Sequence, residues 1–507
     1  MSDLTARQRW ILLAASLAVG LAFLDETAVV TALRAIQADF GATSSEVQWV
    51  VGAYLLALAS LMAAAGRLAD MYGRRRLFAI GAWLFGLGSL AAAAAPGIDA
   101  LIAARVVQGC GAALLMPLGM ANATAALPEE RRGWTVGIVS TGATVFLALG
   151  PLVGGALTEL VGWRWIFLIN LLPIAAILVV TARSFPEWRA PERVPFDLLG
   201  LLLLVSGLVA LTLPLLSMAE WGFGSPVTIA LLAGACVLLA AFVVVERWRA
   251  HPLVELRLLR DPAVSGLLLA LLAIQFTILG LSVYLTLYLQ HVLGYSPMVA
   301  GLLALPTVFL APFLATPTGR ATDRHGPRWP TAAAMAMAAV ALLAIALLAH
   351  VEEVLLLMPA FVAFGIARPI ATVAATSGTV GAIPREQRGL ASALATQSRQ
   401  LGAVLGVALL GLVLTSVELD RRDELLRGVD AGLSQEGRAA LDGILAESDA
   451  SAKLLARLPA DARTAAQDGA AEAYVSGFRA AMLVSALLAL AGAVATLVLR
   501  RHARRTI

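Results

Sequence analysis

Long apolar stretches separated by short polar segments run along the whole chain of 507 residues. A helix needs roughly 20 apolar residues to cross the hydrocarbon core of a bilayer, and fourteen stretches of about that length occur. The pattern therefore predicts an all-α polytopic membrane protein. We expect transmembrane helices at 10–34, 47–68, 77–95, 99–122, 135–157, 164–182, 198–217, 227–245, 263–288, 299–316, 330–349, 354–377, 391–416 and 475–499.

One polar pattern occurs twice in the chain. The segments Gly66–Arg76 and Gly319–Arg328 both read G-R-x-x-D-x-x-G-x-R, and each joins the second apolar stretch of a half to the third. Such a repeat is typical of transporters built from two halves, with the binding site between them. We expect an N-terminal six-helix half at 1–195, two inserted helices at 196–260, and a C-terminal six-helix half at 261–507 with an extracellular loop at 417–474.

The composition agrees with a membrane protein, and the arginines predict its orientation. The chain is 60% hydrophobic and 14% charged, and its mean hydropathy is +0.85. Most arginines outside the spans lie in alternate loops, for example Arg74, Arg75 and Arg76. By the positive-inside rule these loops and both termini are cytoplasmic. The long polar segment 417–474 then lies outside, as an acidic vestibule for cations or as a solvated cap without a specific role.

Several other functions are disfavoured. Lys453 is the only lysine, and no G-x-x-x-x-G-K-[ST] phosphate loop surrounds it. Cys110 and Cys236 are far apart in the sequence, and the histidines lie in loops, tails or span ends. These positions disfavour a metal site inside the membrane and an enzyme that would use one. No basic patch is interleaved with aromatic residues, as nucleic-acid binding would require. We expect no cofactor other than protons as the coupling ion, and a monomer whose partners are the lipid bilayer and a small amphipathic organic substrate.

A few charged residues lie inside the predicted spans, where each costs roughly 2.5–3.5 kcal/mol by insertion scales. The acids are Asp25 and Glu26, and the bases are Arg105, Arg368 and Arg399. A carboxyl group in such a position is a candidate proton carrier, although a neighbour can also neutralise it for structural reasons. Adjacent helix residues point about 100° apart, so Asp25 and Glu26 do not face one cavity equally.

Small residues gather in the fifth predicted span. Gly142, Gly150, Gly154 and Gly155 allow neighbouring backbones to approach closely, and Pro151 interrupts the helix hydrogen bonds. A moving transporter can use such a compliant point, and static packing is the alternative.

With these features the chain resembles the fourteen-span drug:proton antiporter branch of the major facilitator superfamily over essentially its whole length. Segment Gly66–Arg76 resembles the loop between the second and third helices of that branch, and Leu24–Thr27 resembles its first-span acidic motif. Segment Leu101–Ala113 resembles the fourth-span motif associated with proton transfer, and Gly142–Gly155 resembles the antiporter motif. The start of the sixth span is similar at Trp163–Phe167, Asn170 and Pro173. Val30, Arg34 and Arg368 depart from the pattern of the branch.

The resemblance implies the major facilitator fold, proton antiport and drug-like substrates. It implies proton coupling at Asp25, Glu26 and Arg105, and a gating loop with Gly66, Asp70, Gly73 and Arg74. Residues expected to line the substrate cavity between the halves are Gln48, Tyr54, Gln108, Thr144, Gln275, Phe276, Tyr284 and Arg368.

These inferences predict a proton-coupled exporter of amphipathic drugs or antibiotics in the cytoplasmic membrane of a bacterium. A dedicated exporter of one endogenous metabolite has the same sequence features. A proton-coupled importer shares the fold but normally lacks the fifth-span motif. A channel or receptor does not need a buried carboxyl group opposite an arginine-bearing helix. The sequence does not identify the substrate.

Overall fold

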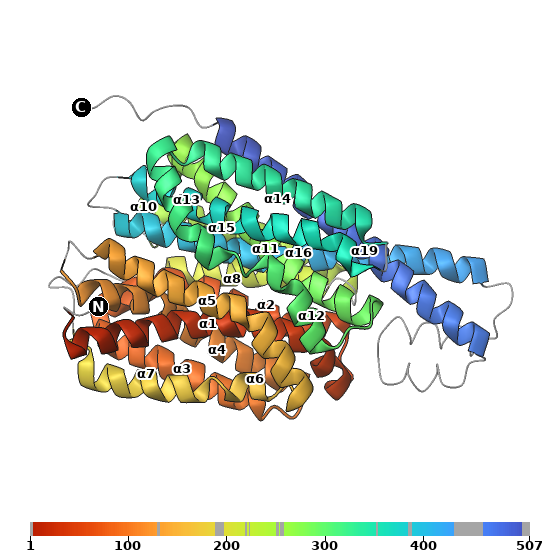
Figure 1. Cartoon of the computed structure of the whole chain (residues 1–507), viewed down its shortest axis with the longest axis horizontal. Coiled ribbons are helices and arrows are strands. Elements are labelled where there is room, and N and C mark those ends of the chain that lie inside the picture. The colour runs from red at the N-terminus through yellow and green to blue at the C-terminus, as the bar shows by residue number, and fades with distance from the viewer. Residues whose placement is uncertain are drawn as a thin grey trace.

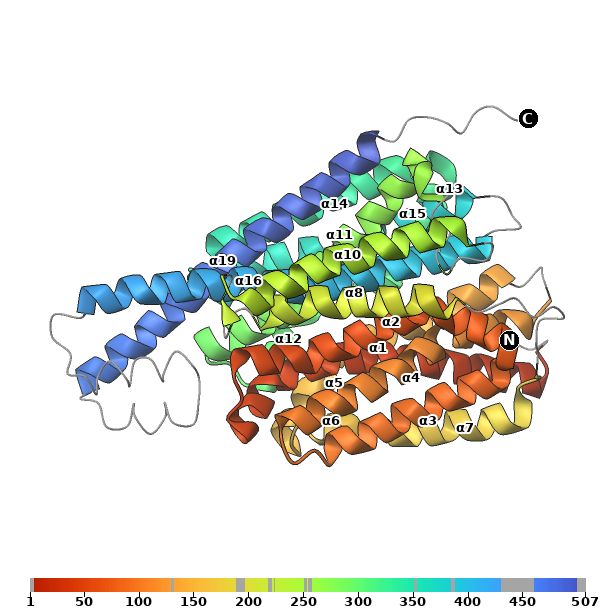
Figure 2. The same cartoon turned by 180° about the vertical axis from the view of Figure 1, so that it is seen from behind.

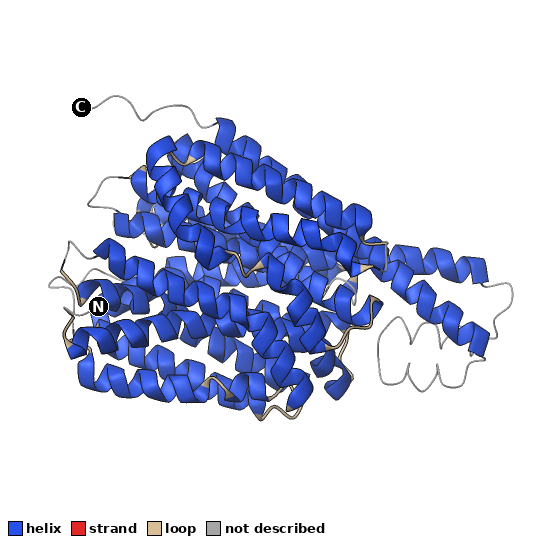
Figure 3. Ribbon diagram, in the orientation of Figure 1, coloured by secondary structure: helices blue, strands red, loops and turns tan. Residues whose placement is uncertain are grey.

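A computed structural model describes residues 4–128, 132–187, 197–217, 221–222, 224–249, 253, 258–350, 353–383, 388–429 and 460–498. These residues form helices joined by turns and loops, without a strand in the described part (Figure 3). Fourteen helical segments are long and apolar enough to cross a membrane. The predicted number of transmembrane helices is confirmed.

The first group of helices packs together below the second in Figure 1. Its main contacts join α1 to α5, α2 to α4 and α3 to α4. Its members are α1 (Ala6–Phe40), α2 (Ser44–Tyr72), α3 (Arg74–Ala93), α4 (Ile98–Ala125), α5 (Arg132–Leu160), α6 (Trp165–Leu168) and α7 (Leu171–Ser184).

The second group is centred on contacts of α11 with α16 and of α14 with α15 and α19. Its α-helices are α11 (Pro262–Leu287), α12 (Pro297–Ala304), α13 (Ala311–His325), α14 (Arg328–Leu348), α15 (Met358–Gly381), α16 (Arg388–Val429) and α19 (Ala460–Val498). Short helical turns join them: η2 (Leu258–Arg260), η3 (Tyr288–Val292), η4 (Leu305–Thr307) and η5 (Val354–Leu357).

Two further helices, α8 (Leu198–Leu216) and α10 (Pro226–Trp248), pack side by side along the seam between the groups (Figure 2). Helix α8 contacts α2 of the first group and α16 of the second. Because the boundary at 195–196 lies outside the described residues, the division into 1–195, 196–260 and 261–507 stays a prediction.

The tenth span is interrupted, unlike the continuous helix predicted at 299–316. Helix α12 ends at Ala304, the 3-10 turn η4 contains Pro306, and α13 begins next to Pro312. Proline lacks a backbone N–H and disfavours helical geometry in the residue before it, so the two prolines explain the break.

The last two spans are longer than predicted. Helices α16 and α19 continue beyond the apolar stretches and project from the molecule together (Figure 1). Arg421 of α16 donates a hydrogen bond of 2.6 Å to Glu472 of α19 in this projection. The flanks of segment 417–474 therefore extend two long helices, and residues 430–459 lie outside the described part of the chain.

The first residues of α1 and the last residues of α19 lie at one end of the molecule, opposite the projection of α16 and α19 (Figure 1). Which end faces the cytoplasm can be tested with single cysteines at His325 and Ser434 in a variant lacking Cys110 and Cys236. We expect an impermeant thiol reagent to label position 434 in intact cells, and position 325 only after permeabilisation. Labelling of both positions in intact cells would show that the orientation or the span count is wrong.

Candidate functional site

A buried ion pair joins Asp25 of α1 to Arg105 of α4. Both side chains are completely buried, and Nη1 of Arg105 donates to Oδ2 of Asp25. The same nitrogen donates to Oε1 of Gln108 at 2.6 Å, and Nε of Arg105 donates to the carbonyl oxygen of Val50 at 2.9 Å. The guanidinium group also lies 4.3 Å from the ring centre of Tyr54 on α2, a cation–π contact.

The other oxygen of Asp25 accepts two hydrogen bonds. Nε2 of Gln108 donates at 2.7 Å, and Nδ2 of Asn170, at the start of α7, donates at 3.1 Å. Both amides also donate to Oγ of Ser89 on α3, at 3.0 and 3.2 Å. Side chains and backbone from α1, α2, α3, α4 and the start of α7 therefore form one network around this carboxylate.

This network can act as a proton-dependent latch. A proton on Asp25 removes the negative charge that holds Arg105, and breaking a buried pair by removing one partner costs about 3–5 kcal/mol. Protonation therefore changes which arrangement of α1 and α4 is favoured. Asn170 and Ser89 belong to this latch as well. Neither was predicted as a site residue: Asn170 belongs to the segment that resembles the start of the sixth span, and Ser89 is a small polar residue in an apolar stretch.

Glu26 faces away from this network, toward the second group of helices. Arg399 of α16 and Arg368 of α15 exert the largest attractive Coulomb interactions on it. Glu26 is 1% exposed, and neither of its oxygen atoms has a hydrogen-bond partner in the described part of the chain. The two adjacent acids therefore have different surroundings: Asp25 is fully bonded within the first group, and Glu26 lies at the interface between the groups.

Each of the two arginines near Glu26 makes one long hydrogen bond. Nη1 of Arg368 donates to the carbonyl oxygen of Thr307 at 3.4 Å, and Nε of Arg399 donates to Oε1 of Gln275 at 3.5 Å. Of the predicted cavity residues, Arg368 and Gln275 thus belong to this cluster, whereas Tyr54 and Gln108 belong to the Asp25 network. Phe276 is buried beside Gly406 of α16.

The glycines of α5 explain how closely it packs. A Cβ atom at Gly150 would lie 1.8 Å from Oγ1 of Thr27, and one at Gly154 would lie 2.3 Å from the carbonyl oxygen of Ala28. Gly142 is less crowded, with Cβ of Ser16 at 3.2 Å from such an atom. The antiporter-type motif therefore lets α5 contact α1 through backbone, in the same part of α1 that contains Asp25 and Glu26.

The far end of α5 contacts the other group. A Cβ atom at Gly155 would lie 2.4 Å from the carbonyl oxygen of Pro297 in α12, and one at Gly301 of α12 would lie 2.2 Å from the carbonyl oxygen of Pro151. The backbone N–H of Met298 donates to Oε2 of Glu159 at 3.2 Å. This contact lies toward the end of the molecule from which α16 and α19 project (Figure 1).

Helix α1 and η3, the turn that follows α11, close the same end. Nη1 of Arg34 donates to the carbonyl oxygen of Gln290, and Nε2 of Gln290 donates to the carbonyl oxygen of Thr31 at 2.9 Å. The two groups of helices are therefore joined at this end through both α1 and α5, by contacts that a transport cycle has to break.

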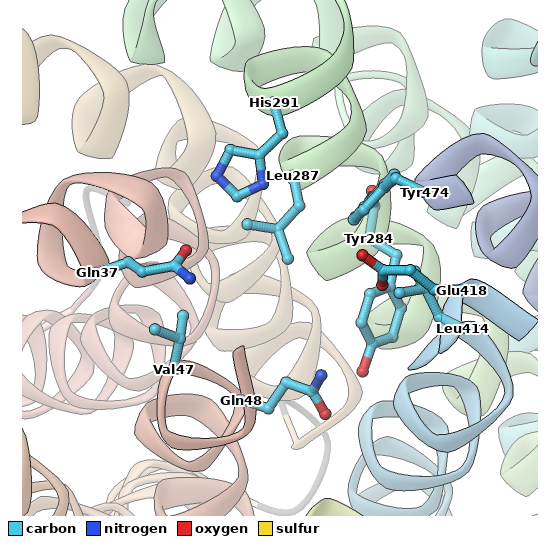
Figure 4. A pocket seen from close by; sticks show the side chains of 9 residues that line it. All are labelled: Gln37, Val47, Gln48, Tyr284, Leu287, His291, Leu414, Glu418 and Tyr474. Carbon is cyan, nitrogen blue, oxygen red and sulfur yellow. Dashed lines mark hydrogen bonds between the residues drawn. The ribbon is translucent and has the colours of Figure 1, made fainter. Parts of the chain in front are cut away.

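A cavity of about 20 Å³ remains near this closed end, which is room for about one water molecule. Two predicted cavity residues, Gln48 and Tyr284, line it (Figure 4). The other lining residues are Gln37, Val47, Leu287, His291, Leu414, Glu418 and Tyr474. Thr144, on α5, is not among its lining residues. The cavity is too small for an organic substrate, so this conformation is closed here.

The polar loop after α2 turns at Gly73, whose φ of 104° favours glycine. The N–H of Arg75 donates to Oε1 of Glu187 at 3.2 Å, and Nη2 of Arg75 donates to the carbonyl oxygen of Ala182 at 2.6 Å. The loop thus contacts the end of α7. Arg74 begins α3, and a Cβ atom at Gly66 would meet no atom within 4 Å. The side chain of Asp70 lies outside the described residues.

Known proteins share this sequence and architecture. Residues 15–407 match the family described as Major Facilitator Superfamily. The chain is 33% identical over 411 residues to the multidrug resistance protein Stp of Mycobacterium tuberculosis, with 80% of this chain and 75% of that protein covered. It is 31% identical over 417 residues to the tetracenomycin C resistance and export protein of Streptomyces glaucescens, with 82% and 77% covered.

A solved structure shows the same fold. The inward-facing, occupied form of a bacterial homologue of the human lysosomal transporter Spinster superposes with a TM-score of 0.69 at 18% identity, over 98% of this chain and 97% of that one. The expected major facilitator fold is thus confirmed. The similar proteins indicate that this chain is a multi-pass bacterial membrane protein that carries small organic compounds. The chain belongs to the Major Facilitator Superfamily of membrane transporters.

Proposed function

We propose that the protein is a proton-coupled antiporter that exports amphipathic organic compounds, drugs or antibiotics among them, across the cytoplasmic membrane. The observation that carries the proposal is the buried pair of Asp25 and Arg105. A carboxylate placed where charge is costly, and tied to several helices at once, can convert the gain or loss of a proton into helix movement. The proton is the coupling ion, no other cofactor is expected, and the protein works as a monomer with both termini in the cytoplasm.

The described conformation is compatible with outward transport. Contacts of α5 with α12 and of α1 with η3 close the end that we place outside. Arg399, nearer the opposite end of α16, is partly exposed. Substrate then enters from the cytoplasm, and the outer contacts open for its release. A proton taken up by Asp25 from outside favours the return, and its loss to the cytoplasm resets the pair with Arg105.

Relatives support export of antibiotic-like compounds. The names of two of them refer to multidrug resistance and to resistance and export of tetracenomycin C. The second name also favours the alternative function, the dedicated export of one endogenous metabolite, because that relative is named for a single compound.

Susceptibility profiling tests the proposal and separates it from the alternative. A bacterial host without its own exporters is given the wild-type gene or Asp25→Asn and grown with unrelated amphipathic compounds. We expect wild-type protein to raise the inhibitory concentration of several compounds and the variant to raise none. Protection against one compound alone favours the dedicated exporter. Increased sensitivity caused by wild-type protein would indicate import and contradict the proposal.

A further inference from the structure

The interface between the two groups of helices contains an excess of positive charge. Glu26 of α1 is near enough to Arg368 of α15 and Arg399 of α16 for an attractive Coulomb interaction with each, and the two arginines repel each other. The cluster has two guanidinium groups and one carboxyl group. Asp25 and Arg105 add no net charge nearby, because they neutralise each other. The cluster therefore carries a net charge of at least one positive unit inside the membrane-spanning region.

The donors of the two arginines are poorly used. A guanidinium group offers five N–H donors, yet among the described residues Arg368 and Arg399 make one hydrogen bond each, at 3.4 and 3.5 Å. Both bonds go to neutral oxygen atoms, the carbonyl of Thr307 and the amide of Gln275. Glu26 accepts none of these donors in the described part of the chain. Since buried charges are normally paired and hydrogen-bonded, the cluster lacks an anionic acceptor.

The side chains of the cluster differ in exposure. Glu26 and Arg368 are 1% and 6% exposed, whereas Arg399 is partly exposed. Among the described residues, the contacts of α1 with η3 and of α5 with α12 close the end of the molecule away from Arg388. A ligand that binds the arginines therefore arrives from the end of α16 that contains its first residue, Arg388, which is the cytoplasmic end under the proposed orientation.

We propose that Arg368 and Arg399 form a subsite for the anionic group of the substrate, so that the transported compounds are amphipathic carboxylates, phenolates or zwitterions. Resting on the proposed function, this assigns the substrate class of the exporter. A planar carboxylate fits the fork of a guanidinium group and satisfies two donors at once. Glu26 is the internal competitor of that anion, since its negative charge lowers the net positive charge that the substrate meets. A purely cationic compound is repelled by the same two arginines.

Two dyes that differ in one group test the subsite directly. Rhodamine 110 has a free carboxylate, and rhodamine 123 is its methyl ester and a cation. Their binding to purified protein in nanodiscs of zwitterionic lipid is measured by fluorescence anisotropy near neutral pH, without transport. We expect wild-type protein to prefer rhodamine 110. Arg368→Gln should weaken its affinity for rhodamine 110 by about tenfold, as expected for the loss of one charge-assisted hydrogen bond, and leave rhodamine 123 unchanged or bound more tightly.

Further variants separate charge from folding. Glu26→Gln removes the competing negative charge and should tighten rhodamine 110 binding, opposite to Arg368→Gln. Arg368→Lys keeps the charge without the planar fork, so its affinity for rhodamine 110 should lie between those of wild type and Arg368→Gln. Arg479→Gln is the control, because Arg479 of α19 is an exposed arginine outside the cluster that also donates to a carbonyl oxygen, that of Ala346, at 3.1 Å. Its preference between the dyes should equal that of wild type.

Three results would overturn the subsite: no binding of rhodamine 110 to wild-type protein, tighter binding of rhodamine 123 than of rhodamine 110, or an unchanged dye preference in Arg368→Gln protein that elutes as a folded monomer. If Arg368→Gln does not fold, the Glu26→Gln variant decides: tighter binding of rhodamine 110 than in wild type supports the subsite, and unchanged binding contradicts it. Because binding is measured at equilibrium, the outcome does not depend on proton coupling. Failure of a pH gradient to drive transport would contradict the proposed function and leave the dye result standing.

Discussion

Asp25→Asn protein is expected to fold and insert but to lose all export driven by a pH gradient. Asparagine has nearly the shape of aspartate and can still accept hydrogen bonds from Gln108 and Asn170, but it cannot gain or lose a proton. Arg105 then keeps its charge in the buried network without its anionic partner, at a cost of about 3–5 kcal/mol. The measurement is substrate flux into vesicles with and without an imposed pH gradient.

Two variants control this experiment. Asp39→Asn removes another acid of α1, whose ion pair with Arg164 at 2.8 Å is solvent-exposed and is worth at most about 1 kcal/mol. Its gradient-driven flux should match wild type. Asp25→Glu restores a carboxyl group and should recover part of the flux. Gradient-driven flux in Asp25→Asn at the wild-type rate would show that Asp25 is not the proton carrier.

Gly155→Leu is expected to abolish transport for a steric reason. Even the Cβ atom of the new side chain would lie 2.4 Å from the carbonyl oxygen of Pro297, closer than real Cβ contacts. Overpacking costs about 1–3 kcal/mol, and here the cost falls only on conformations in which α5 and α12 touch. A penalty of that size changes the population of the closed outer end by about 5- to 150-fold. The variant should therefore remain open to the outside and fail to complete the cycle.

The accessibility of the outer cavity measures this effect. A single cysteine at Leu414, which is buried and lines the cavity, should react slowly with an impermeant reagent in the wild-type background and faster with Gly155→Leu. Gly137→Leu is the matched control in the same helix, since a Cβ atom at Gly137 meets no atom within 4 Å. Equal reactivity in the two variants would contradict a closing role for the contact of α5 with α12.

The sequence was sufficient to predict the fourteen spans, because a membrane helix has to bury its own backbone hydrogen bonds in one apolar stretch. It did not predict the break after Ala304 or the helical extensions of α16 and α19. The break follows from Pro306 and Pro312, which the length and hydropathy of the apolar stretch do not reveal. The extensions of α16 and α19 have polar sequences, so neither the length nor the hydropathy of the apolar stretches indicates that the helices continue.

The candidate site was only partly predictable for a similar reason. Asp25, Glu26 and Arg105 are conspicuous as charges in apolar spans, and the angle between adjacent helix residues separates the directions of the two acids. The partners are set by contacts between distant segments: Asn170 approaches Asp25 from α7, and Arg368 and Arg399 approach Glu26 from the second group of helices. No spacing rule in the sequence connects these residues. Of the predicted cavity residues, only Gln48 and Tyr284 line the cavity near the closed end.

Proton coupling is tested most directly with wild-type protein reconstituted into sealed liposomes that contain a pH-sensitive dye. The substrate is a compound to which the protein confers resistance. With an acidic interior and an alkaline medium, we predict that substrate accumulates inside against its gradient while protons leave, and that nigericin abolishes both movements. Substrate accumulation that is the same with and without the pH gradient, with no accompanying proton flux, would contradict the account.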